Sequence, residues 1–254
     1  MPHSQDKYSR FAPVECDMEF DWFAKDRPEP PPPKPKRLTQ WDFIMSGEND
    51  TNFDRKQRMI FQMSDLCRTC TMCELGRRQA EKNGTCRDPH VLSNLKPSRF
   101  VVVGQNPGWD ELAAGCPFVG AAGKNFDREI EKNGLTRDEL YITNVVKCWT
   151  KNNAKPDVKH VHKCKPFLQM EFNLLNPLLV VTLGAVPFGL LCPDAVYGDC
   201  LQKITKSEQY GVNVFAIYHP SPLNLTQEVR RTMFGEQVRV LGQLVKKLKK
   251  RHKI

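Results

Sequence analysis

The fold of this chain is decided by Phe100-Val101-Val102-Val103-Gly104-Gln105-Asn106-Pro107-Gly108, an apolar run that ends in a turn of glycine, amide and proline residues. A β-branched run followed by such a turn is typical of a buried strand. In open α/β sheets, ligands bind at the carboxyl ends of the parallel strands. We therefore expect the turn to present its side-chain amides to a ligand. An amide pair on a rigid turn, with the ring of Phe118 close behind in the sequence, suits a flat polar molecule such as a nucleobase.

Strand and helix patterns alternate along the rest of the chain. Apolar runs that predict strands cover residues 140–144, 178–183 and 212–218, and helical patterns cover about 52–75, 121–133, 158–175 and 227–250. Alternation of this kind is typical of a parallel sheet with helices on both faces. The expected fold is therefore a three-layer α/β/α sandwich around a central, mainly parallel, four-stranded sheet.

The composition favours a basic protein of the cell interior. The 254 residues carry a formal net charge of +9, with a pI near 9.0 and a mean hydropathy of −0.52. Such a balance suits a polyanionic partner, although a soluble basic surface explains it equally well. We expect no membrane contact, because there is no apolar run of about 18 residues, and no signal peptide follows Met1. The expected location is a reducing compartment: cytoplasm or nucleoid, or host cytoplasm for a viral protein.

Residues 1–50 are expected to form a disordered, proline-rich, basic tail, with the folded domain over residues 51–254. The segment Arg27-Pro28-Glu29-Pro30-Pro31-Pro32-Pro33-Lys34-Pro35-Lys36-Arg37 favours polyproline II and cannot form a packed core. A solvated linker is the simpler interpretation of this tail. Docking to a protein partner is the alternative.

The cysteines are spaced for metal binding rather than for disulfides. The chain has ten, and a reducing compartment disfavours a disulfide framework. Cys70 and Cys73 form a C-x-x-C pair, Cys148 follows a predicted strand, and Cys164 lies in a predicted helix. Four thiolates from these segments would suit either zinc or an iron–sulfur cluster. Cys67 repeats the same spacing, so the choice between Cys67 and Cys70 stays open.

Several motifs follow one another in an order typical of one family. They are Cys70-x-x-Cys73-x-Leu75-x-x-Arg78, Gly104-Gln105-Asn106-Pro107-Gly108, Gly115-Cys116-Pro117-Phe118-Val119-Gly120-Ala121-Ala122-Gly123, Tyr141-Ile142-Thr143-Asn144-Val145-Val146-Lys147-Cys148, Cys164-Lys165-Pro166-Phe167-Leu168, Val181-Thr182-Leu183-Gly184 and His219-Pro220-Ser221-Pro222-Leu223. Over about residues 60–248 the chain resembles the uracil-DNA glycosylase superfamily, most of all its iron–sulfur group, family 4. The resemblance implies that Cys70, Cys73, Cys148 and Cys164 ligate a structural [4Fe–4S] cluster, with zinc as the alternative.

The resemblance also implies roles in binding DNA. A base must be flipped out of the duplex before its glycosidic bond is attacked. Phe118 would stack on the flipped ring, and the Asn144 amide would read its polar edge. His219 would stabilise the negative charge that develops on the leaving base, and Leu223 would fill the gap in the duplex. The loop beside Leu223 would supply the other DNA contacts, Ser221, Pro222 and Asn224.

The turn after the first strand departs from family 4. Gln105 and Asn106 stand where that family carries Glu-Ala, and Gly-x-Asn-Pro-Gly resembles the mismatch-specific and single-strand-selective branches, in which the Asn positions a water molecule. The predicted catalytic residues are therefore Asn106, His219, Gln105 and Glu111, with Glu111 as a candidate base. Gly108 and Gln105 are also expected to contact the base. Strict uracil enzymes resemble this turn but carry Tyr in place of Gly108. Its missing side chain predicts room for 5-substituted uracils.

We therefore expect a monomeric DNA glycosylase that acts on DNA containing uracil or a modified pyrimidine. It would hydrolyse the N-glycosidic bond and leave an abasic site for base excision repair. A non-hydrolytic protein that binds and protects uracil-containing DNA is the alternative, and a metal-containing DNA-binding module with a vestigial pocket is a third.

Overall fold

The centre of the structure is a five-stranded sheet with the strand order β2-β1-β3-β5-β4. A computed structural model describes residues 53–81 and 91–254, so the predicted tail, residues 1–50, lies outside the described residues. The strands are β1 (Phe100–Gly104), β2 (Tyr141–Asn144), β3 (Leu179–Leu183), β4 (Ile204–Ser207) and β5 (Val212–Ile217). β1 pairs in parallel with β2 and β3, and β3 with β5. The expected α/β class with a mainly parallel sheet is confirmed.

The expected number of strands is wrong by one, because β4 was not predicted. β4 pairs antiparallel with β5 at the edge of the sheet, in the register Ile204↔Phe215. Of its four residues only Ser207 is buried. A short edge strand that is mostly exposed needs no apolar run, because hydrogen bonds to the neighbouring strand hold it in place. Its sequence therefore carries no pattern that predicts a strand.

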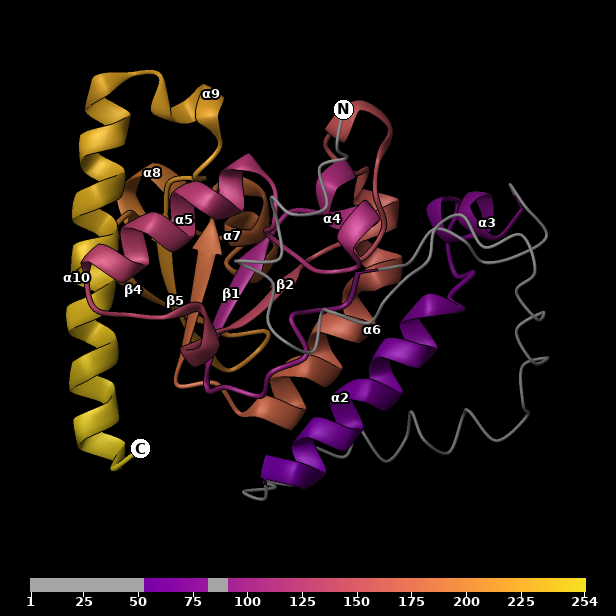
Figure 1. The fold of residues 1–254 in the computed structure, drawn as a ribbon, viewed down its shortest axis with the longest axis horizontal. Helices are drawn as coiled ribbons and strands as arrows, with labels where there is room; N and C mark the ends of the chain where they lie inside the picture. The colour runs from indigo at the N-terminus through magenta and orange to yellow at the C-terminus, as the bar shows by residue number, and fades with distance from the viewer. Residues whose placement is uncertain (1–52, 82–90) are drawn as a thin grey trace, which may run out of the picture.

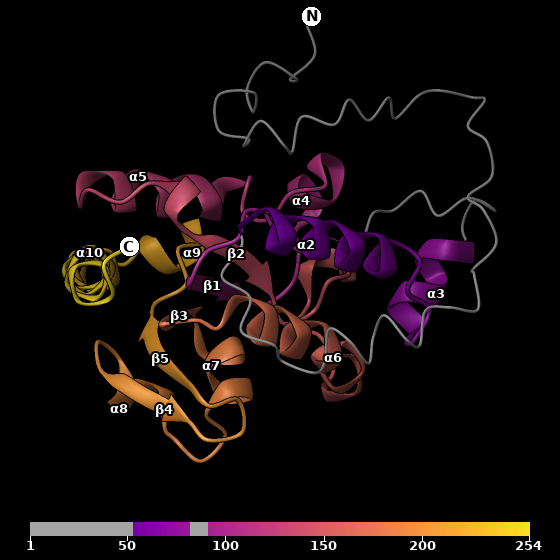
Figure 2. The ribbon, with the colours of Figure 1, turned by 90° about the horizontal axis from the view of Figure 1, so that it is seen from below.

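Helices cover both faces of the sheet and form the expected three layers. Figure 2 shows α5 and α10 on one side of the strands and α6 and α7 on the other. In Figure 1 the long α10 runs along one flank of the molecule, and α2 and α6 lie side by side on the opposite flank. The helices are α2 (Phe53–Arg68), α3 (Glu74–Glu81), α4 (Trp109–Ala114), α5 (Ala121–Lys132), α6 (Val158–Leu175), α7 (Ala185–Leu191), α8 (Tyr197–Cys200), α9 (Pro222–Leu225) and α10 (Glu228–His252), with 3-10 turns η3 (Arg137–Glu139) and η4 (Lys151–Asn153).

Alternation along β1 divides the core into two parts. Val101 and Val103 pack with α2, α6 and α7 on one face, whereas Phe100 and Val102 pack with α5 and α10 on the other. Successive side chains of a strand point to opposite faces, so a strand covered on both sides is apolar throughout. Burying one such side chain contributes about 1.5–3 kcal/mol. This is why the continuous apolar run in the sequence marks the central strand.

The carboxyl ends of the parallel strands meet at one edge of the sheet. Gly104 at the end of β1 is paired with Asn144 at the end of β2. β3 runs into Gly184, and β5 leads through Tyr218 to His219. The turns that follow these strands therefore lie together at this edge, where the motifs predicted a ligand site.

The helix pattern predicted over residues 52–75 is divided in the structure. α2 ends at Arg68, and the backbone N–H of Cys70 donates to the carbonyl of Cys67 in the turn before α3. The turn exposes the C-x-x-C segment instead of continuing the helix.

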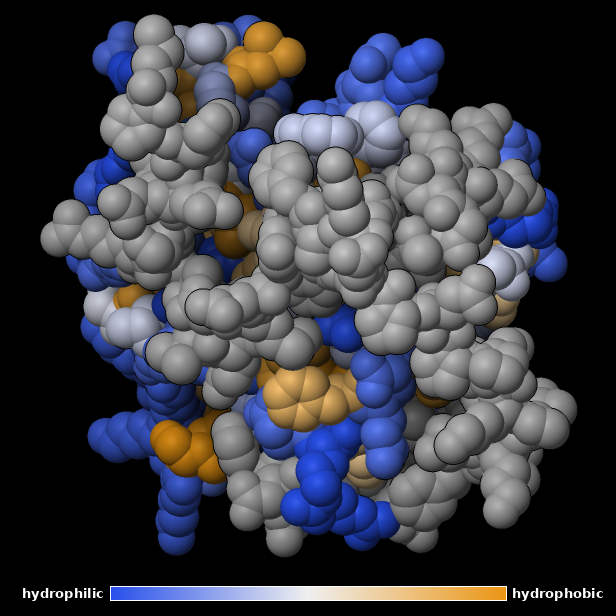
Figure 3. Space-filling view, turned by 45° about the vertical axis from the view of Figure 1, so that its right-hand side comes forward, coloured by the Kyte–Doolittle hydropathy of each residue, from blue (hydrophilic) through white to orange (hydrophobic). Residues whose placement is uncertain are grey.

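Figure 3 shows one face of the molecule. Most of the coloured side chains visible on it are hydrophilic, and the apolar ones form small separate patches. Among the helices of residues 53–81 and 91–254, none combines the length and the apolar character needed to cross a membrane.

Candidate active site

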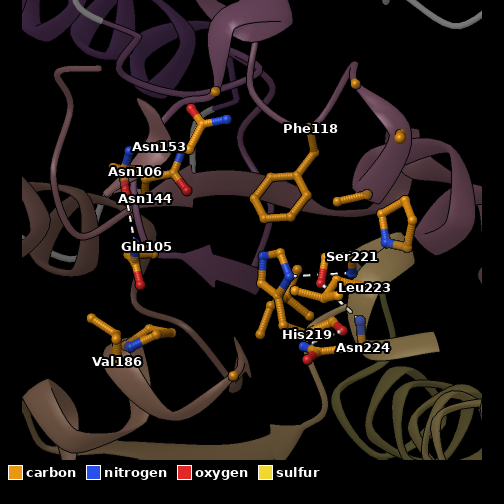
Figure 4. Close-up of a pocket in the computed structure, with 18 of the residues that line it drawn as sticks. Gln105, Asn106, Phe118, Asn144, Asn153, Val186, His219, Ser221, Leu223 and Asn224 are labelled. Carbon is orange, nitrogen blue, oxygen red and sulfur yellow. Dashed lines mark hydrogen bonds between the residues drawn. The ribbon is translucent and has the colours of Figure 1, made fainter. Parts of the chain in front are cut away.

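A groove with a volume of about 810 Å³ lies at the carboxyl ends of the strands. Figure 4 shows Gln105, Asn106 and Asn144 on one side of it in this view, and Phe118 and His219 on the other. The structure brings all the predicted non-cysteine site residues to this groove. They are Gln105, Asn106, Gly108, Glu111, Phe118, Asn144, His219, Ser221, Pro222, Leu223 and Asn224.

The amide of Asn144 is buried without a hydrogen-bond partner. Asn144 is 1% exposed, and neither its Oδ1 nor its Nδ2 atom has a partner among the residues that the structure describes. Leaving a buried polar group unpaired costs about 1–3 kcal/mol. An unpaired donor and acceptor at the wall of a groove therefore indicate a ligand that offers the complementary pair.

Gly104 lets the Asn144 amide and the Phe118 ring approach each other. A Cβ atom at Gly104 would lie 2.4 Å from Oδ1 of Asn144 and 2.5 Å from Cζ of Phe118. No side chain fits at such distances. Glycine is thus required beneath the place where the amide and the aromatic face converge.

Phe118 is held in an unfavourable backbone conformation by contacts from other segments. Its φ is +56°, in the left-handed region that side chains other than glycine seldom adopt. Nη1 of Arg137 donates to the Phe118 carbonyl at 3.0 Å and to Oδ1 of Asp127 at 3.0 Å, and the Arg137 guanidinium also donates to the Pro117 carbonyl. Gly123 completes the site, since a Cβ there would lie 1.7 Å from the Phe118 carbonyl oxygen. These contacts fix the ring at the groove.

Gln105 and Asn106 form a chain of side-chain amides. Nε2 of Gln105 donates to Oδ1 of Asn106 at 2.9 Å. Nδ2 of Asn106 in turn donates to the carbonyl of Pro107 at 3.0 Å and to Oγ1 of Thr150 at 3.1 Å. The two predicted catalytic amides are thus joined to each other, and the second is anchored at both of its N–H groups.

The Glu111 carboxylate joins two turns at the wall of the groove. Its Oε2 accepts the N–H of Gly108 and its Oε1 accepts the N–H of Gly120, both at 2.9 Å. A Cβ at Gly108 would lie 2.5 Å from Oε2. The room that the missing Gly108 side chain leaves is therefore partly taken by a carboxylate, and Glu111 holds the two turns together.

His219 is placed as a neutral hydrogen-bond donor. Its Nδ1 accepts the backbone N–H of Ser221 at 3.2 Å, so in the neutral ring the proton resides on Nε2. Burial lowers the pKa of His219 to about 4. The imidazole is therefore uncharged at neutral pH. Its ring centroid lies 6.3 Å from that of Phe118.

The loop after His219 presents an exposed apolar side chain beside the groove. Oγ of Ser221 accepts the N–H of Asn224, and Nδ2 of Asn224 donates to the His219 carbonyl at 3.2 Å. These bonds shape α9, and Leu223 on it is 81% exposed. An apolar side chain so exposed on a short, braced helix can enter a partner molecule.

Five cysteines come from α2, the turn before α3, the loop after β2 and α6; they are Cys67, Cys70, Cys73, Cys148 and Cys164. A hydrogen bond with the Cys148 thiol lowers the pKa of Cys73 to about 5, and burial raises the pKa of Cys164 to about 12. Cys70 and Cys73 also raise the pKa of Cys164, and the pKa of Cys67 is raised first by burial and next by Cys164. All five thiols therefore share one neighbourhood, so the choice between Cys67 and Cys70 stays open.

The donor chemistry of these cysteines fits a thiolate-bound metal centre. None of the eight cysteines in the described residues forms a disulfide, and the lowered pKa of Cys73 favours the thiolate that a metal would bind. As placed, no three His, Cys, Asp or Glu side chains of the described residues are grouped tightly enough to hold an ion. His160, one helical turn before Cys164 on α6, is buried with both ring nitrogens unpaired among the described atoms, and it contributes to lowering the pKa of Cys73.

The sequence motifs did not identify the residues that support the site from positions far away in the sequence. Arg137, Asp127 and Thr150 belong to none of the motifs, and His160 is a single histidine in a helix. Each acts through a contact formed by folding, such as the 44-residue separation between Asn106 and Thr150. A local pattern carries no signal of such contacts.

Several known proteins are similar to the chain in sequence. The model of the uracil DNA glycosylase superfamily matches residues 92–242. A type-4 uracil-DNA glycosylase of Archaeoglobus fulgidus is 34% identical over 183 residues, covering 69% of this chain and 88% of the relative. A type-4 uracil-DNA glycosylase of Thermotoga maritima is 32% identical over 189 residues, covering 71% of this chain and 92% of the relative.

Proposed function

The chain belongs to the uracil-DNA glycosylase superfamily, and from that membership we propose that it flips uracil out of DNA and hydrolyses its N-glycosidic bond. The product is an abasic site that base excision repair would process. The protein would act as a monomer in a reducing compartment inside the cell, and its tail would be free to bind a protein partner.

The observation that carries this proposal is the unpaired, buried amide of Asn144. The polar edge of uracil offers an acceptor, O4, next to a donor, N3–H. An Asn amide complements both, with Nδ2–H to O4 and Oδ1 to N3–H. The two Asn144 atoms lack other partners among the described residues, and Phe118 lies beside them over Gly104. A flipped pyrimidine would supply the missing bonds and a face for the ring.

Bond cleavage would draw on His219 and Asn106. As the glycosidic bond breaks, negative charge develops on the base, and the neutral Nε2–H of His219 can donate to O2. One such donor contributes about 3 kcal/mol to the transition state. Asn106 cannot deprotonate water, because an amide does not titrate in the useful range. It would position the water, with Gln105 at its side and Glu111 holding the turn.

The rim of the groove would hold the DNA. Leu223 would enter the space that the flipped base leaves, as apolar wedges do. Ser221, Pro222 and Asn224 shape this loop and would lie against the strand, where backbone N–H groups contact phosphates.

A second part of the proposal concerns 5-substituted uracils. Gly108 leaves the pocket without a blocking side chain, and the Glu111 carboxylate and Asn153 amide border that space. A 5-hydroxymethyl group can donate a hydrogen bond to such a wall, whereas a methyl group cannot. Hydroxymethyluracil is therefore the favoured 5-substituted substrate.

The function is tested with duplexes that contain uracil, thymine or hydroxymethyluracil opposite guanine or adenine. We expect alkali-labile sites to accumulate with time on uracil, and also on hydroxymethyluracil. Asn106→Ala should lower turnover at least about 100-fold while DNA binding is retained. Stoichiometric retention of uracil-containing DNA without cleavage would instead support the binding protein. Activity confined to uracil, equal opposite adenine and guanine, would contradict the second part.

We also propose that Cys70, Cys73, Cys148 and Cys164 hold a [4Fe–4S] cluster, with zinc as the alternative. The bound cluster would join the segment between α2 and α3 to the sheet as a structural cross-link. Protein purified without oxygen should contain iron and acid-labile sulfide. Cys73→Ala should lose both and melt at a lower temperature, whereas Cys192→Ala, at the C-cap of α7, should keep both. Zinc without sulfide would contradict the iron–sulfur assignment.

A further inference from the structure

We propose that Thr150 is a positioning residue that fixes the orientation of the Asn106 amide. The inference rests on the proposed function, because it concerns how Asn106 handles the attacking water. Thr150 belongs to none of the sequence motifs and lies in the loop that follows Cys148. It is buried, and its hydroxyl contacts the Asn106 side chain at 3.1 Å.

The hydroxyl of Thr150 donates its proton to Ala154 and not to Asn106. Oγ1 lies 2.6 Å from the carbonyl oxygen of Ala154, and a carbonyl accepts but never donates. The single hydroxyl proton must therefore point to Ala154. Towards Asn106, Oγ1 is left as an acceptor.

An acceptor at Thr150 determines which end of the Asn106 amide faces it. Only the NH₂ group can donate to Oγ1, and its second hydrogen goes to the Pro107 carbonyl at 3.0 Å. Both N–H groups are then used. Oδ1 must point the other way, where Nε2 of Gln105 donates to it, as the dashed line in Figure 4 shows.

The result is an Asn106 side chain that can only accept further hydrogen bonds. Oδ1 keeps a second lone pair at the groove, to which a water molecule can donate one proton. The oxygen lone pair of that water then stays free to attack the sugar carbon. A reversed amide would donate to the water oxygen, which draws electron density from the attacking atom and leaves the water proton without this acceptor.

The loop that carries Thr150 is folded to hold this arrangement. Asn152 and Asn153 have φ values of 58° and 53°, in the left-handed region that Asn tolerates better than most residues. The N–H of Asn153 donates to the Thr150 carbonyl at 2.9 Å. These two residues turn the chain so that the Ala154 carbonyl returns to the Thr150 hydroxyl.

The test is Thr150→Val, which removes the hydroxyl and keeps the shape. We expect the single-turnover rate of uracil excision to fall about 10- to 100-fold, the loss expected for one or two hydrogen bonds, with the Kd for uracil-containing DNA unchanged. Thr150→Ser keeps the hydroxyl and should restore most of the rate. In an Asn106→Ala background, Thr150→Val should cause little further loss.

Thr182→Val is the matched control. Thr182 is buried in β3, and its hydroxyl has no partner among the described residues. Its removal should leave the rate unchanged. If the wild-type protein excises uracil and Thr150→Val does so at the same rate, the inference is overturned while the proposed function stands. A loss of DNA affinity in place of rate, or a Thr150→Ser variant as slow as Thr150→Val, would also overturn it. If the wild-type protein excises no base, the proposed function itself fails.

Discussion

Replacing Glu171 with alanine is expected to lower the free energy of unfolding by about 3–5 kcal/mol, because it leaves the Lys147 ammonium buried without its counter-charge. Both side chains are almost fully buried, and Nζ of Lys147 lies 2.6 Å from Oε2 of Glu171. Tyr141 donates to Oε1 of Glu171 at 2.9 Å, so the same substitution also removes the acceptor of a buried hydroxyl proton. Urea denaturation followed by circular dichroism measures the loss as a lower midpoint.

The double variant Lys147→Met/Glu171→Leu is the control for this prediction. Apolar replacement of both partners of a buried ion pair is often neutral, whereas removal of one partner is costly. We expect the double variant to be more stable than Glu171→Ala. A loss below about 1 kcal/mol for Glu171→Ala would be typical of an exposed pair and would contradict the buried network.

The Lys147 network also connects the core to the site. Nζ of Lys147 donates to the backbone carbonyl of Asn144 at 2.8 Å, and its backbone N–H donates to Sγ of Cys164 at 3.3 Å. One residue therefore contacts the proposed base-reading residue and a proposed cluster ligand. The position of Asn144 is therefore fixed both by the hydrogen bond from Lys147 and by the pairing of β2 in the sheet.

Much of the fold could be predicted because its central strands are buried on both faces. The run Val101-Val102-Val103 is fully buried, and such strands are continuous apolar segments in any sequence. β4 could not be predicted, because Thr205 and Lys206 give no apolar pattern and its pairing depends on β5. The division of the first helix pattern into α2 and α3 was also missed, since the turn at residues 69–73 contains no glycine or proline to mark it.

The site could be predicted where its residues lie beside a strand end. Asn106, Asn144 and His219 each follow or end a parallel strand, and those ends share one edge of the sheet. Thr150 and Arg137 could not be predicted, because their role comes from contacts with residues 44 and 19 positions away. The residues proposed to contact a ligand can be predicted from the sequence, because they lie at strand ends. The residues that position them depend on tertiary packing and cannot.

Gly104→Ala is expected to abolish base excision while the protein stays folded. The new Cβ would lie 2.4 Å from Oδ1 of Asn144 and 2.5 Å from Cζ of Phe118, so at least one of the two side chains must move. Both atoms are the ends of side chains, so the sheet can keep its pairing with Asn144. A displacement of about 1 Å at a reacting site costs about 100-fold in rate, and here two base contacts are disturbed together. We therefore expect kcat/KM for uracil-containing DNA to fall more than about 100-fold.

Gly189→Ala distinguishes loss of the site from a general effect of replacing glycine. Gly189 is exposed on α7, and a Cβ there meets no described atom within 4 Å. Alanine in a helix is favoured over glycine by about 1 kcal/mol, so this variant should be at least as stable as the wild type and fully active. Thermal melting and excision are measured on both variants, with binding to DNA that lacks uracil as a third measurement. Because we propose that this binding uses the rim of the groove, we expect Gly104→Ala to retain it. An active Gly104→Ala variant would mean that the base does not lie between Asn144 and Phe118, and the unpaired Asn144 amide would then need another ligand.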